Sequence, residues 1–593
     1  WLCKSTIWIF FIIKYLLLRA SEIIVNISTN NSSNRFQMQK HYFVNLHLFI
    51  SLKNPNHQNV RKIFTILSVS FSLIATAQTE LVFVFFKDKP NKAAFYSNPL
   101  SELSQKSLER RSNLGITLSD QDAPIEQSYI TNIQNLGFTV TDYSKWLNGV
   151  AVNATPTQIQ TLAQQSFVDH VESFVRNPNG GKRTEKIEKF KDLQEIGNKS
   201  AITTFNYGYG LPQANQINVR ALHVAGFTGT GMTIAVIDTG FPSVNTGNAF
   251  KRLRDNGQIK GGYNFINKTS DIYNTSLNSH GSVCLGAIGG YLDGQFVGTA
   301  PDADFYLYAS EDAGNEIPEE QLYWIEAAEE ADRKGVDLIS TSLGYHTFDD
   351  SRYDYTYADM NGTTSFIARG AQIATEKGIF VTFAAGNDGN NSWHYVATPA
   401  DNEKVFTIGA VTSQGTSSTF SSYGPNADGV VKPDGVARGT ETFTVYGGQV
   451  TQASGTSLAN PVAAGGVACL LQSLPKSISR EAVKDKLRQD ASLYPNYDDQ
   501  QGYGILNFYK TYQTLSVTDL KKTQVKIYPN PAKNFINIST EKAIQSIEIY
   551  DVLGRLIKTE TKNNINVSQL AKGNYFLKIK TSDQELIEKF IKE

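Results

Sequence analysis

The sequence predicts a protein of several domains, whose central region has an α/β fold with a mostly parallel sheet and helices on both faces. We expect a small α+β domain before this region and a small all-β sandwich after it. Three observations support the prediction. The 593 residues suit two to four domains. Apolar runs alternate with helix-length stretches in the middle of the chain. Short alternating segments separated by turns fill its C-terminal end.

The composition limits the class of protein further. Hydrophobic residues make up 40% of the chain and there are 45 glycines, which is typical of globular proteins and excludes disorder throughout. Lys and Arg number 55 against 56 Asp and Glu, so no basic surplus points to a nucleic-acid partner. The three cysteines are too few for a structural zinc site and allow at most one disulfide.

The N-terminal residues have the pattern of a secretion signal. Residues 60–77 contain the basic pair Arg61-Lys62, the apolar run Ile63–Ala75 and a small-residue cleavage site ending at Ala77. The run is short for a membrane anchor, so we expect a signal peptide and no permanent membrane span. The chain begins with Trp, and we interpret residues 1–59 as an upstream extension that is not part of the mature protein.

Residues 78–176 are predicted to form the small α+β domain, followed by an exposed linker over residues 177–203. Thr155-Pro156-Thr157-Gln158 has the pattern of a capping box at a helix start. The linker is rich in Lys and Glu, with few large apolar residues, and such segments are where proteases cut. The other predicted elements are strands at Leu81–Phe86, Trp146–Asn153 and Phe167–Val175 and a helix at Pro99–Asn113.

Residues 204–515 are predicted to form the central α/β domain and residues 520–593 the β-sandwich. Alternation of strands and helices implies a parallel sheet, because each crossover needs a helix. The central elements are predicted strands at Thr233–Ile237, Phe305–Tyr308, Asp337–Ser340, Ile379–Phe383 and Val405–Ile408 and a helix at Pro318–Lys334.

Asp238 is the first candidate catalytic residue, because it ends an apolar strand and precedes Thr239-Gly240. A turn-forming aspartate would give the same pattern. An aspartic protease would need a second carboxylate sharing a proton, and the sequence has no second Asp-Thr-Gly or Asp-Ser-Gly.

His280 is the second candidate. The central domain offers four histidines, His223, His280, His346 and His394, and only His280 has small residues around it at a predicted helix start. Small neighbours would leave its ring accessible to a substrate. A hydrogen-bonded structural histidine is the alternative interpretation.

Ser457 is the third candidate, in Ser454-Gly-Thr-Ser-Leu-Ala-Asn-Pro461 before a helix of small residues at Val462–Leu474. Proline is tolerated in the first turn of a helix, so Pro461 predicts a helix start close to Ser457. Free backbone N–H groups there suit a nucleophile that forms an oxyanion. An ordinary helix-capping serine is the alternative.

The order Asp, His, Ser, each in its own local sequence, resembles the subtilase family of serine endopeptidases across the central domain. The resemblance extends to four further segments, Gly298–Pro301, Ser340–Gly344, Phe383–Asn387 and Phe420–Gly424. An esterase of the α/β-hydrolase type would need Gly-x-Ser-x-Gly and a different residue order, and the sequence has neither.

The resemblance implies a role for each matching residue. Ser457 would be the nucleophile, His280 the general base and Asp238 the group that orients the imidazole, with Asn387 in the oxyanion hole. No metal is implied in the chemistry. The implied substrate-binding residues are Ser342, Leu343, Gly344, Ala384, Ala385 and Gly386.

The sequence also departs from the family pattern. Ser282 and Leu458 replace the usual Thr and Met, which affects packing more than chemistry. Cys284 is expected to be a buried small residue, although a Cys284–Cys469 disulfide stays open. A catalytically inactive binding module is the non-enzyme alternative.

The same resemblance implies roles for the two flanking domains. Residues 78–176 occupy the place of an inhibitory prodomain, with cleavage in the linker and a mature start near Ser200 to Tyr207, although a permanent accessory domain is the alternative. The C-terminal unit, with Ile527-Tyr-Pro-Asn-Pro531 and Tyr550-Asp-Val-Leu-Gly-Arg555, resembles the type IX secretion sorting domain of Bacteroidota. A carbohydrate-binding sandwich is the alternative there.

The expected protein is therefore a secreted or cell-surface endopeptidase that passes through the periplasm and outer membrane. Its expected partners are protein or peptide substrates, its own prodomain and the secretion machinery. No cofactor is required for the chemistry. Structural calcium is an open expectation, with one acidic loop as a candidate that contains Asp349, Asp350, Asp354 and Asp359.

Overall fold

A computed structural model describes residues 78–187, 189, 194–195, 205–518, 526–540, 543–552, 555–581 and 585–593. The predicted signal peptide, the upstream extension and the first residues of the predicted mature start lie outside this part of the chain. Among the described helices, none has the length and apolar character needed to cross a membrane.

The N-terminal domain has a four-stranded antiparallel sheet in the order β2-β3-β1-β4. One face of the sheet packs against its own helices, with Val82 and Val84 in that core. The capping box at Thr155 and Gln158 is confirmed. The elements are β1 (Glu80–Phe86), β2 (Asp142–Ser144), β3 (Gly149–Ala154), β4 (Val168–Ser173), α4 (Lys92–Ser97), α5 (Gln105–Leu114), α6 (Gln127–Asn135) and α7 (Pro156–Ala163).

The helix predicted from Pro99 begins later. Ser104 caps α5 by accepting a hydrogen bond from the backbone N–H of Ser107, so the α-helix begins at Gln105. The preceding Pro99–Ser101 forms a short 3₁₀ turn. A second 3₁₀ turn is at Asp120–Asp122.

The central domain has a seven-stranded sheet in the order β14-β13-β12-β11-β6-β10-β7, and all of its strand pairs are parallel. Five of these strands match the predicted ones and confirm the α/β fold. The strands are β6 (Thr233–Asp238), β7 (Ile259–Asn264), β10 (Asp304–Ala309), β11 (Leu338–Thr341), β12 (Phe380–Ala384), β13 (Phe406–Val411) and β14 (Gly435–Arg438).

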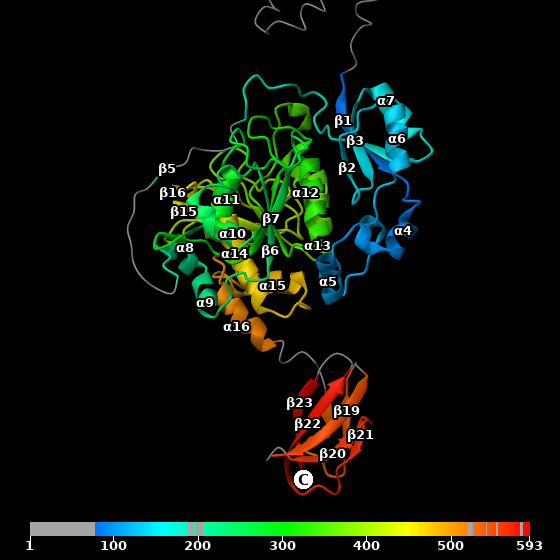
Figure 1. Cartoon of the computed structure of the whole chain (residues 1–593), viewed down its shortest axis with the longest axis vertical. Coiled ribbons are helices and arrows are strands. Elements are labelled where there is room, and N and C mark those ends of the chain that lie inside the picture. Colours follow the sequence, from blue (N-terminus) through cyan, green and yellow to red (C-terminus); the bar gives the residue numbers. More distant parts are fainter. Residues whose placement is uncertain are drawn as a thin grey trace, which may run out of the picture. The chain divides into compact units, whose positions relative to one another are not determined.

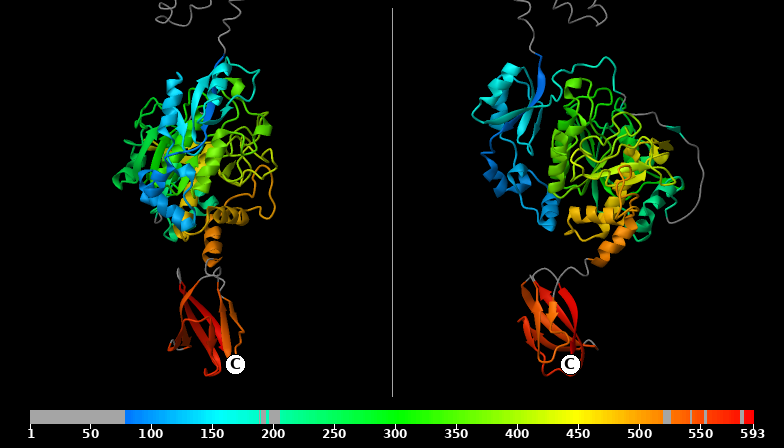
Figure 2. Two further views of the ribbon diagram at one scale, coloured as in Figure 1. Left: turned by 90° about the vertical axis from the view of Figure 1, so that its right-hand side faces the viewer. Right: turned by 180° about the vertical axis from the view of Figure 1, so that it is seen from behind.

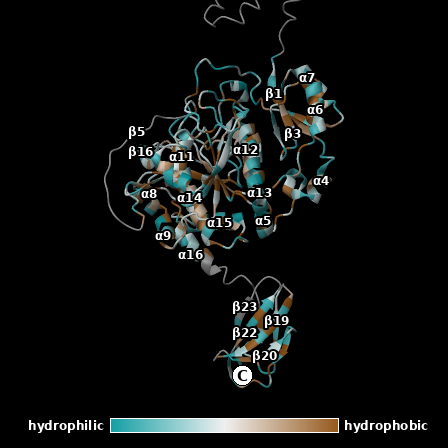
Figure 3. Ribbon diagram, viewed as in Figure 1, coloured by the Kyte–Doolittle hydropathy of each residue, from teal (hydrophilic) through white to brown (hydrophobic). Residues whose placement is uncertain are grey.

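Helices cover both faces of the sheet (Figures 1 and 2). Alternate residues of β6 point to opposite faces: Ile234 and Val236 share a core with α11 (His280–Gly289) and α14 (Thr456–Ser473). Ala235 and Ile237 share the other core with α12 (Glu320–Lys334) and α13 (Phe366–Glu376). In Figure 3 hydrophobic residues concentrate in the strands between these helices.

Smaller elements complete the central domain. Strands β15 (Thr442–Tyr446) and β16 (Gln449–Ala453) form a hairpin, whose second strand also pairs with β5 (Gln194–Glu195) of the linker. The remaining elements are β8 (Tyr291–Leu292), β9 (Phe296–Val297), α8 (Leu211–Gln216), α9 (Val219–Val224), α10 (Lys251–Asp255), α15 (Arg480–Asp490), α16 (Phe508–Thr518) and 3₁₀ turns at Asn248–Phe250, Ser351–Tyr353 and Tyr357–Asp359.

The N-terminal domain contacts α12 and α13 of the central domain. The second face of its sheet, including Leu81 and Phe83, joins the hydrophobic core that contains Phe366. Asp332 of α12 is fully buried and accepts hydrogen bonds from Arg110 and from Arg111, the latter at 2.7 and 3.0 Å. We call this contact surface the docking face.

The C-terminal domain consists of two antiparallel sheets in the orders β17-β18-β21 and β20-β19-β22-β23. Residues of both sheets, such as Ile536 and Ile549, share one core, which confirms the predicted sandwich. The strands are β17 (Lys526–Tyr528), β18 (Phe535–Ser539), β19 (Ile544–Asp551), β20 (Leu556–Glu560), β21 (Asn564–Asn566), β22 (Gly573–Thr581) and β23 (Glu585–Lys592).

Candidate active site

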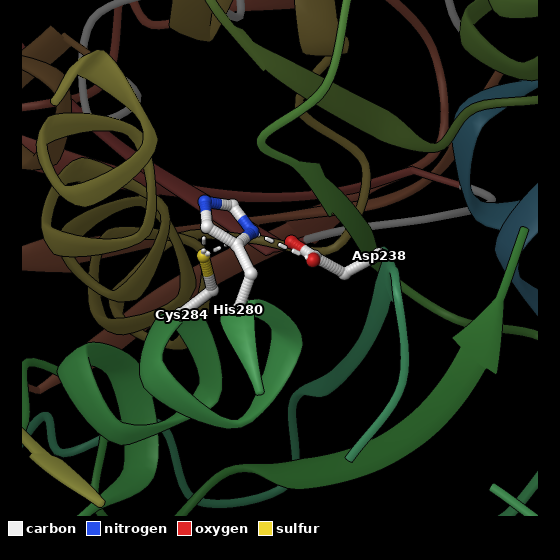
Figure 4. Close-up of side chains that lie close together, drawn as sticks. All are labelled: Asp238, His280 and Cys284. Carbon is white, nitrogen blue, oxygen red and sulfur yellow. Dashed lines mark hydrogen bonds and ion pairs between the residues drawn. The ribbon is translucent and has the colours of Figure 1, made fainter. Parts of the chain in front are cut away.

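Asp238 and His280 meet at the carboxyl edge of the central sheet. Asp238 ends β6 and is fully buried, and His280 is the first residue of α11. His280 Nδ1 lies 2.7 Å from Asp238 Oδ1 (Figure 4). The carboxylate thereby fixes the orientation of the ring, whose side chain keeps 12% of its surface exposed.

Ser457 is the second residue of α14, and its backbone carbonyl has partners outside the helix. The predicted helix start close to Ser457 is confirmed, although Pro461 lies in the second turn of α14 and not in the first. Since proline has no N–H, the Ser457 carbonyl four residues earlier lacks its usual helical donor. It accepts instead from Ser342 Oγ at 3.0 Å and from Cys284 Sγ at 3.3 Å.

Asn387 follows β12 and is held by the start of α14. Its side-chain Oδ1 accepts hydrogen bonds from the backbone N of Thr456 at 2.9 Å and from Thr456 Oγ1 at 3.1 Å. With its oxygen engaged in this way, the amide nitrogen is the end that can donate to a ligand. The pattern Gly-Thr-Ser contains Thr456, but its positioning of Asn387 was missed from the sequence.

Gly455 marks the point where these groups converge. An ideal Cβ at this glycine would lie 2.8 Å from Ser457 Oγ, 3.6 Å from Ser457 N and 3.7 Å from Asn387 Nδ2. A hydroxyl and two N–H donors therefore surround one point, the arrangement that acyl transfer would require. Any larger residue at position 455 would collide with the Ser457 hydroxyl.

A cavity of about 580 Å³ contains this point and connects most of the predicted residues. His280, Asn387 and Ser457 line it. Of the predicted substrate-binding residues, the cavity is lined by Ser342, Leu343, Gly344, Ala384 and Gly386. Ala385 is fully buried behind the cavity, and its backbone N–H donates to Ile408 O at 3.0 Å.

Cys284 lies between the histidine and the helix of the nucleophile. Its sulfur is 3.7 Å from His280 Nδ1 and donates to the Ser457 carbonyl. Burial raises the pKa of this thiol well above its usual range, so the sulfur stays protonated. Cys284 and Cys469 are both free, so the disulfide left open from the sequence is not formed.

The other two departures from the family pattern are packing residues. Ser282 is buried and its hydroxyl donates to Pro242 O at 2.7 Å, and Leu458 is buried in the core that contains α11 and α14. His223 is also structural: it is held by Tyr207 Oη at 2.6 Å and Thr299 O at 2.9 Å, and burial lowers its pKa to about 4.

In the acidic loop considered for calcium, each carboxylate has a partner of its own. Asp350 pairs with Arg352, Asp354 with Arg183, and Asp359 accepts from Thr356 within a 3₁₀ turn. Asp349 accepts from the backbone N of Glu316 at 3.3 Å. The expectation of calcium stays a prediction.

A second group of carboxylates lines or adjoins the cavity and was missed from the sequence. Glu311, Glu316 and Glu320 are buried within metal-binding distance of one another. Lys189 of the linker lies against them. Glu316 and Glu320 are four residues apart, but Glu311 falls outside that spacing and nothing in the sequence joined the three to a lysine so far away.

Comparisons with known proteins cover three parts of the chain. Residues 229–504 match the subtilase family. Residues 81–191 match the peptidase S8 propeptide domain of Bacteroidota, and residues 526–593 match the secretion system C-terminal sorting domain.

Two relatives and one solved structure illustrate the likeness. The serine protease AprX of Bacillus subtilis is 30% identical, across 47% of this chain and 66% of that protein. The subtilisin of Bacillus pumilus is also 30% identical, across 50% of this chain and 96% of that protein. The crystal structure of the epidermin leader peptide processing serine protease of Staphylococcus aureus, at 16% identity, covers 73% of this chain and 99% of its own, with a TM-score of 0.50.

Proposed function

The chain belongs to the subtilase family, and from that premise we propose that it is a secreted serine endopeptidase made as a zymogen. It hydrolyses peptide bonds in proteins through an acyl-enzyme intermediate. The observation that carries this proposal is the Asp238–His280 pair, with its 2.7 Å contact, in the cavity that Ser457 lines. An inactive binding module would not need this arrangement.

Ser457 attacks the carbonyl carbon of the substrate while His280 accepts the proton of the hydroxyl. Asp238 stabilises the imidazolium that forms, because its buried carboxylate faces Nδ1. His280 then returns the proton to the leaving amine. Water attacks the acyl-enzyme by the same route and regenerates the free serine.

The developing oxyanion lies near Gly455, between the Ser457 backbone N–H and the Asn387 amide. Both donors are fixed before the substrate arrives: the first by the start of α14, the second by Thr456. Ser342, Leu343, Gly344, Ala384 and Gly386 line the cleft, where the glycines and the alanine let a substrate strand approach closely.

The flanking domains support the zymogen and the export route. The N-terminal domain matches a propeptide domain and buries charged groups against the central domain, which is consistent with an inhibitor that leaves on maturation. The C-terminal match to a sorting domain supports export by the type IX route to the cell surface or medium.

Labelling of the secreted protein with a fluorophosphonate, together with a casein digestion assay, tests the proposal. We expect labelling and casein cleavage by the natural protein, and neither by the Ser457→Ala variant. Absence of labelling after removal of the N-terminal domain would contradict the proposal and favour the binding module.

A further inference from the structure

Glu311, Glu316 and Glu320 form an acidic pocket at one side of the catalytic cleft. Glu311 follows β10, Glu320 is the first residue of α12, and Glu316 lies between them. Glu311 and Glu316 line the same cavity as His280 and Ser457, so the pocket belongs to the surface that a substrate would contact.

Lys189 of the linker fills this pocket. Its ammonium group lies 2.5 Å from Glu311 Oε1, 3.0 Å from Glu316 Oε2 and 3.1 Å from Glu320 Oε2. It also donates to the backbone carbonyls of Asp312 at 2.9 Å and Asn315 at 2.7 Å. The side chain is only 6% exposed, so it is inserted rather than laid across the surface.

The pocket buries three carboxyl groups against one lysine. Glu316 Oε1 is buried and has no hydrogen-bond partner among the described residues. Burial, with the neighbouring Glu311 charge adding, raises the pKa of Glu316 to about 8. A pocket that buries three carboxylates is therefore unfavourable when empty and favours entry of a cation.

The Glu311 carboxylate has its own fixed support. Tyr345 Oη donates to Glu311 Oε2 at 2.7 Å, and the backbone N–H of Asp312 donates to Glu320 Oε1 at 2.7 Å. The acids are thus held in place by the central domain and not by Lys189 alone. The pocket is built to persist once the linker has left.

The linker approaches the cleft through further contacts. Gly181 and Ser351 exchange hydrogen bonds, and Arg183 pairs with Asp354 at 2.5 Å. Ile187 and Lys189 line the catalytic cavity itself. Lys189 therefore belongs to a linker whose described residues also contact the central domain and line its cavity.

We propose that the acidic pocket recognises a lysine or arginine side chain of protein substrates, and that Lys189 occupies it in the zymogen as a substrate-like residue. This inference rests on the proposed endopeptidase function and names its substrate class: chains with a basic residue near the bond that is cut. Three carboxylates and two carbonyls suit an ammonium or guanidinium group.

A divalent cation is the competing occupant, because three carboxylates also suit calcium. The contacts of Lys189 favour the basic side chain. The Lys189 ammonium contacts all three carboxylates and two backbone carbonyls at hydrogen-bond distances, so the pocket already holds a basic group.

The test uses the matured, secreted protein and internally quenched peptides that span linker residues 183–207, which include the predicted mature start. The peptides are identical except at position 189, which is Lys, Arg, norleucine or Glu. Norleucine matches the stem of lysine but lacks its charge. We expect kcat/KM for the Lys and Arg peptides to exceed that for norleucine by about 10- to 100-fold, with Glu slowest.

The Glu316→Gln variant tests whether the pocket causes this preference. We expect its ratio of Lys to norleucine cleavage to fall about 10-fold, because the variant removes one carboxylate from the pocket. Glu376→Gln is the matched control: this exposed glutamate on α13 lies outside the cavity, and its variant should keep the ratio.

Maturation of the zymogen gives a second test that does not depend on folding of the Glu316 variant. Lys189→Met should slow the proteolytic conversion of the full chain to the mature enzyme by about 10-fold, whereas the Lys189→Arg variant should convert at close to the natural rate. Equal conversion of both variants would contradict the inference.

The two proposals fail in different ways. Casein cleavage and fluorophosphonate labelling without preference for Lys over norleucine would overturn the acidic-pocket inference and leave the endopeptidase intact. Calcium that raises cleavage of Lys and norleucine peptides equally, with loss on chelation, would also overturn it in favour of a metal site. Absence of labelling would instead reject the endopeptidase.

Discussion

Two aspartates of the central domain, Asp238 and Asp332, are both fully buried, but their partners come from different places. Asp238 orients His280, which belongs to the same domain. Asp332 is engaged by Arg110 and Arg111, which belong to the N-terminal domain. The first pair is complete within the central domain, whereas the second is complete only while the N-terminal domain is present.

Under the proposed function, this difference would separate the chemistry from its control by the N-terminal domain. Removal of the N-terminal domain leaves the partners of Asp238 and Asn387 in place, because all of them lie in the central domain. The same removal exposes Asp332 to water and takes away two guanidinium groups. Buried ion pairs of this kind are costly to break by loss of one partner, so they favour docking strongly.

The largest effect is expected at Asp238, the aspartate that orients His280 within the central domain. Asp238→Asn should lower kcat on casein or a peptide by about 10⁴-fold, because the amide cannot hold the His280 tautomer that accepts the proton of Ser457. The rate of fluorophosphonate labelling should fall in parallel. A loss smaller than about 10-fold would contradict the role of Asp238.

The second prediction concerns the oxyanion donor. Asn387→Leu should lower kcat by about 10²- to 10³-fold with little change in KM, because the lost hydrogen bond forms mainly in the transition state. Steady-state kinetics on one peptide separate the two constants. Thr456→Val, which removes one of the two donors that orient Asn387, should cause a smaller loss.

The third prediction concerns the buried ion pairs of the docking face. Asp332→Asn should weaken binding of the cleaved N-terminal domain to the central domain by about 3 kcal/mol, or about 100-fold. The reason is that two buried guanidinium groups lose the carboxylate that pairs with both of them. Release of the domain after processing, followed by size-exclusion chromatography, measures the change.

Asp337→Asn is the matched control at the same face. Asp337 pairs with Lys106 at 3.0 Å, and the lysine side chain is 41% exposed. A solvated pair contributes about 1 kcal/mol at most, so release should change by less than 10-fold. Equal effects of both variants would remove the distinction between buried and exposed pairs.

The smallest effect is expected at Cys284, which contacts His280 and the Ser457 carbonyl without taking part in proton transfer. Cys284→Ala should change kcat/KM by no more than about threefold, because Ser342 still donates to that carbonyl. The buried, protonated thiol should also resist iodoacetamide while the enzyme is folded. Inactivation by iodoacetamide in step with thiol labelling would show otherwise.

The fold was predictable where local sequence and tertiary structure agree. Strands β6 and β12 are continuous apolar runs buried on both faces, and both were identified. Strand β7, Ile259–Asn264, contains Gly261-Gly262 and half-buried residues, and β14 has only four residues, so neither has a recognisable pattern. Their positions depend on pairing with neighbouring strands.

The candidate site was predictable only as a set of residues. Asp238 and His280 are 42 residues apart, and only the fold brings them within hydrogen-bond distance. The acidic pocket was missed for the same reason, because Lys189 is 131 residues from Glu320. The helix start near Ser457 was predicted correctly, but Pro461 lies in the second turn, because the Ser457 carbonyl finds donors on other elements.

The attachment of Lys189 to its own enzyme has a consequence for where activation occurs. While the linker is intact, the lysine and the pocket meet at an effective concentration set by the chain, which dilution cannot lower. Once the linker is cut, the same contacts hold two separate molecules together, and their occupancy falls with concentration. Escape into a large volume outside the cell would then act as the trigger, without any chemical signal.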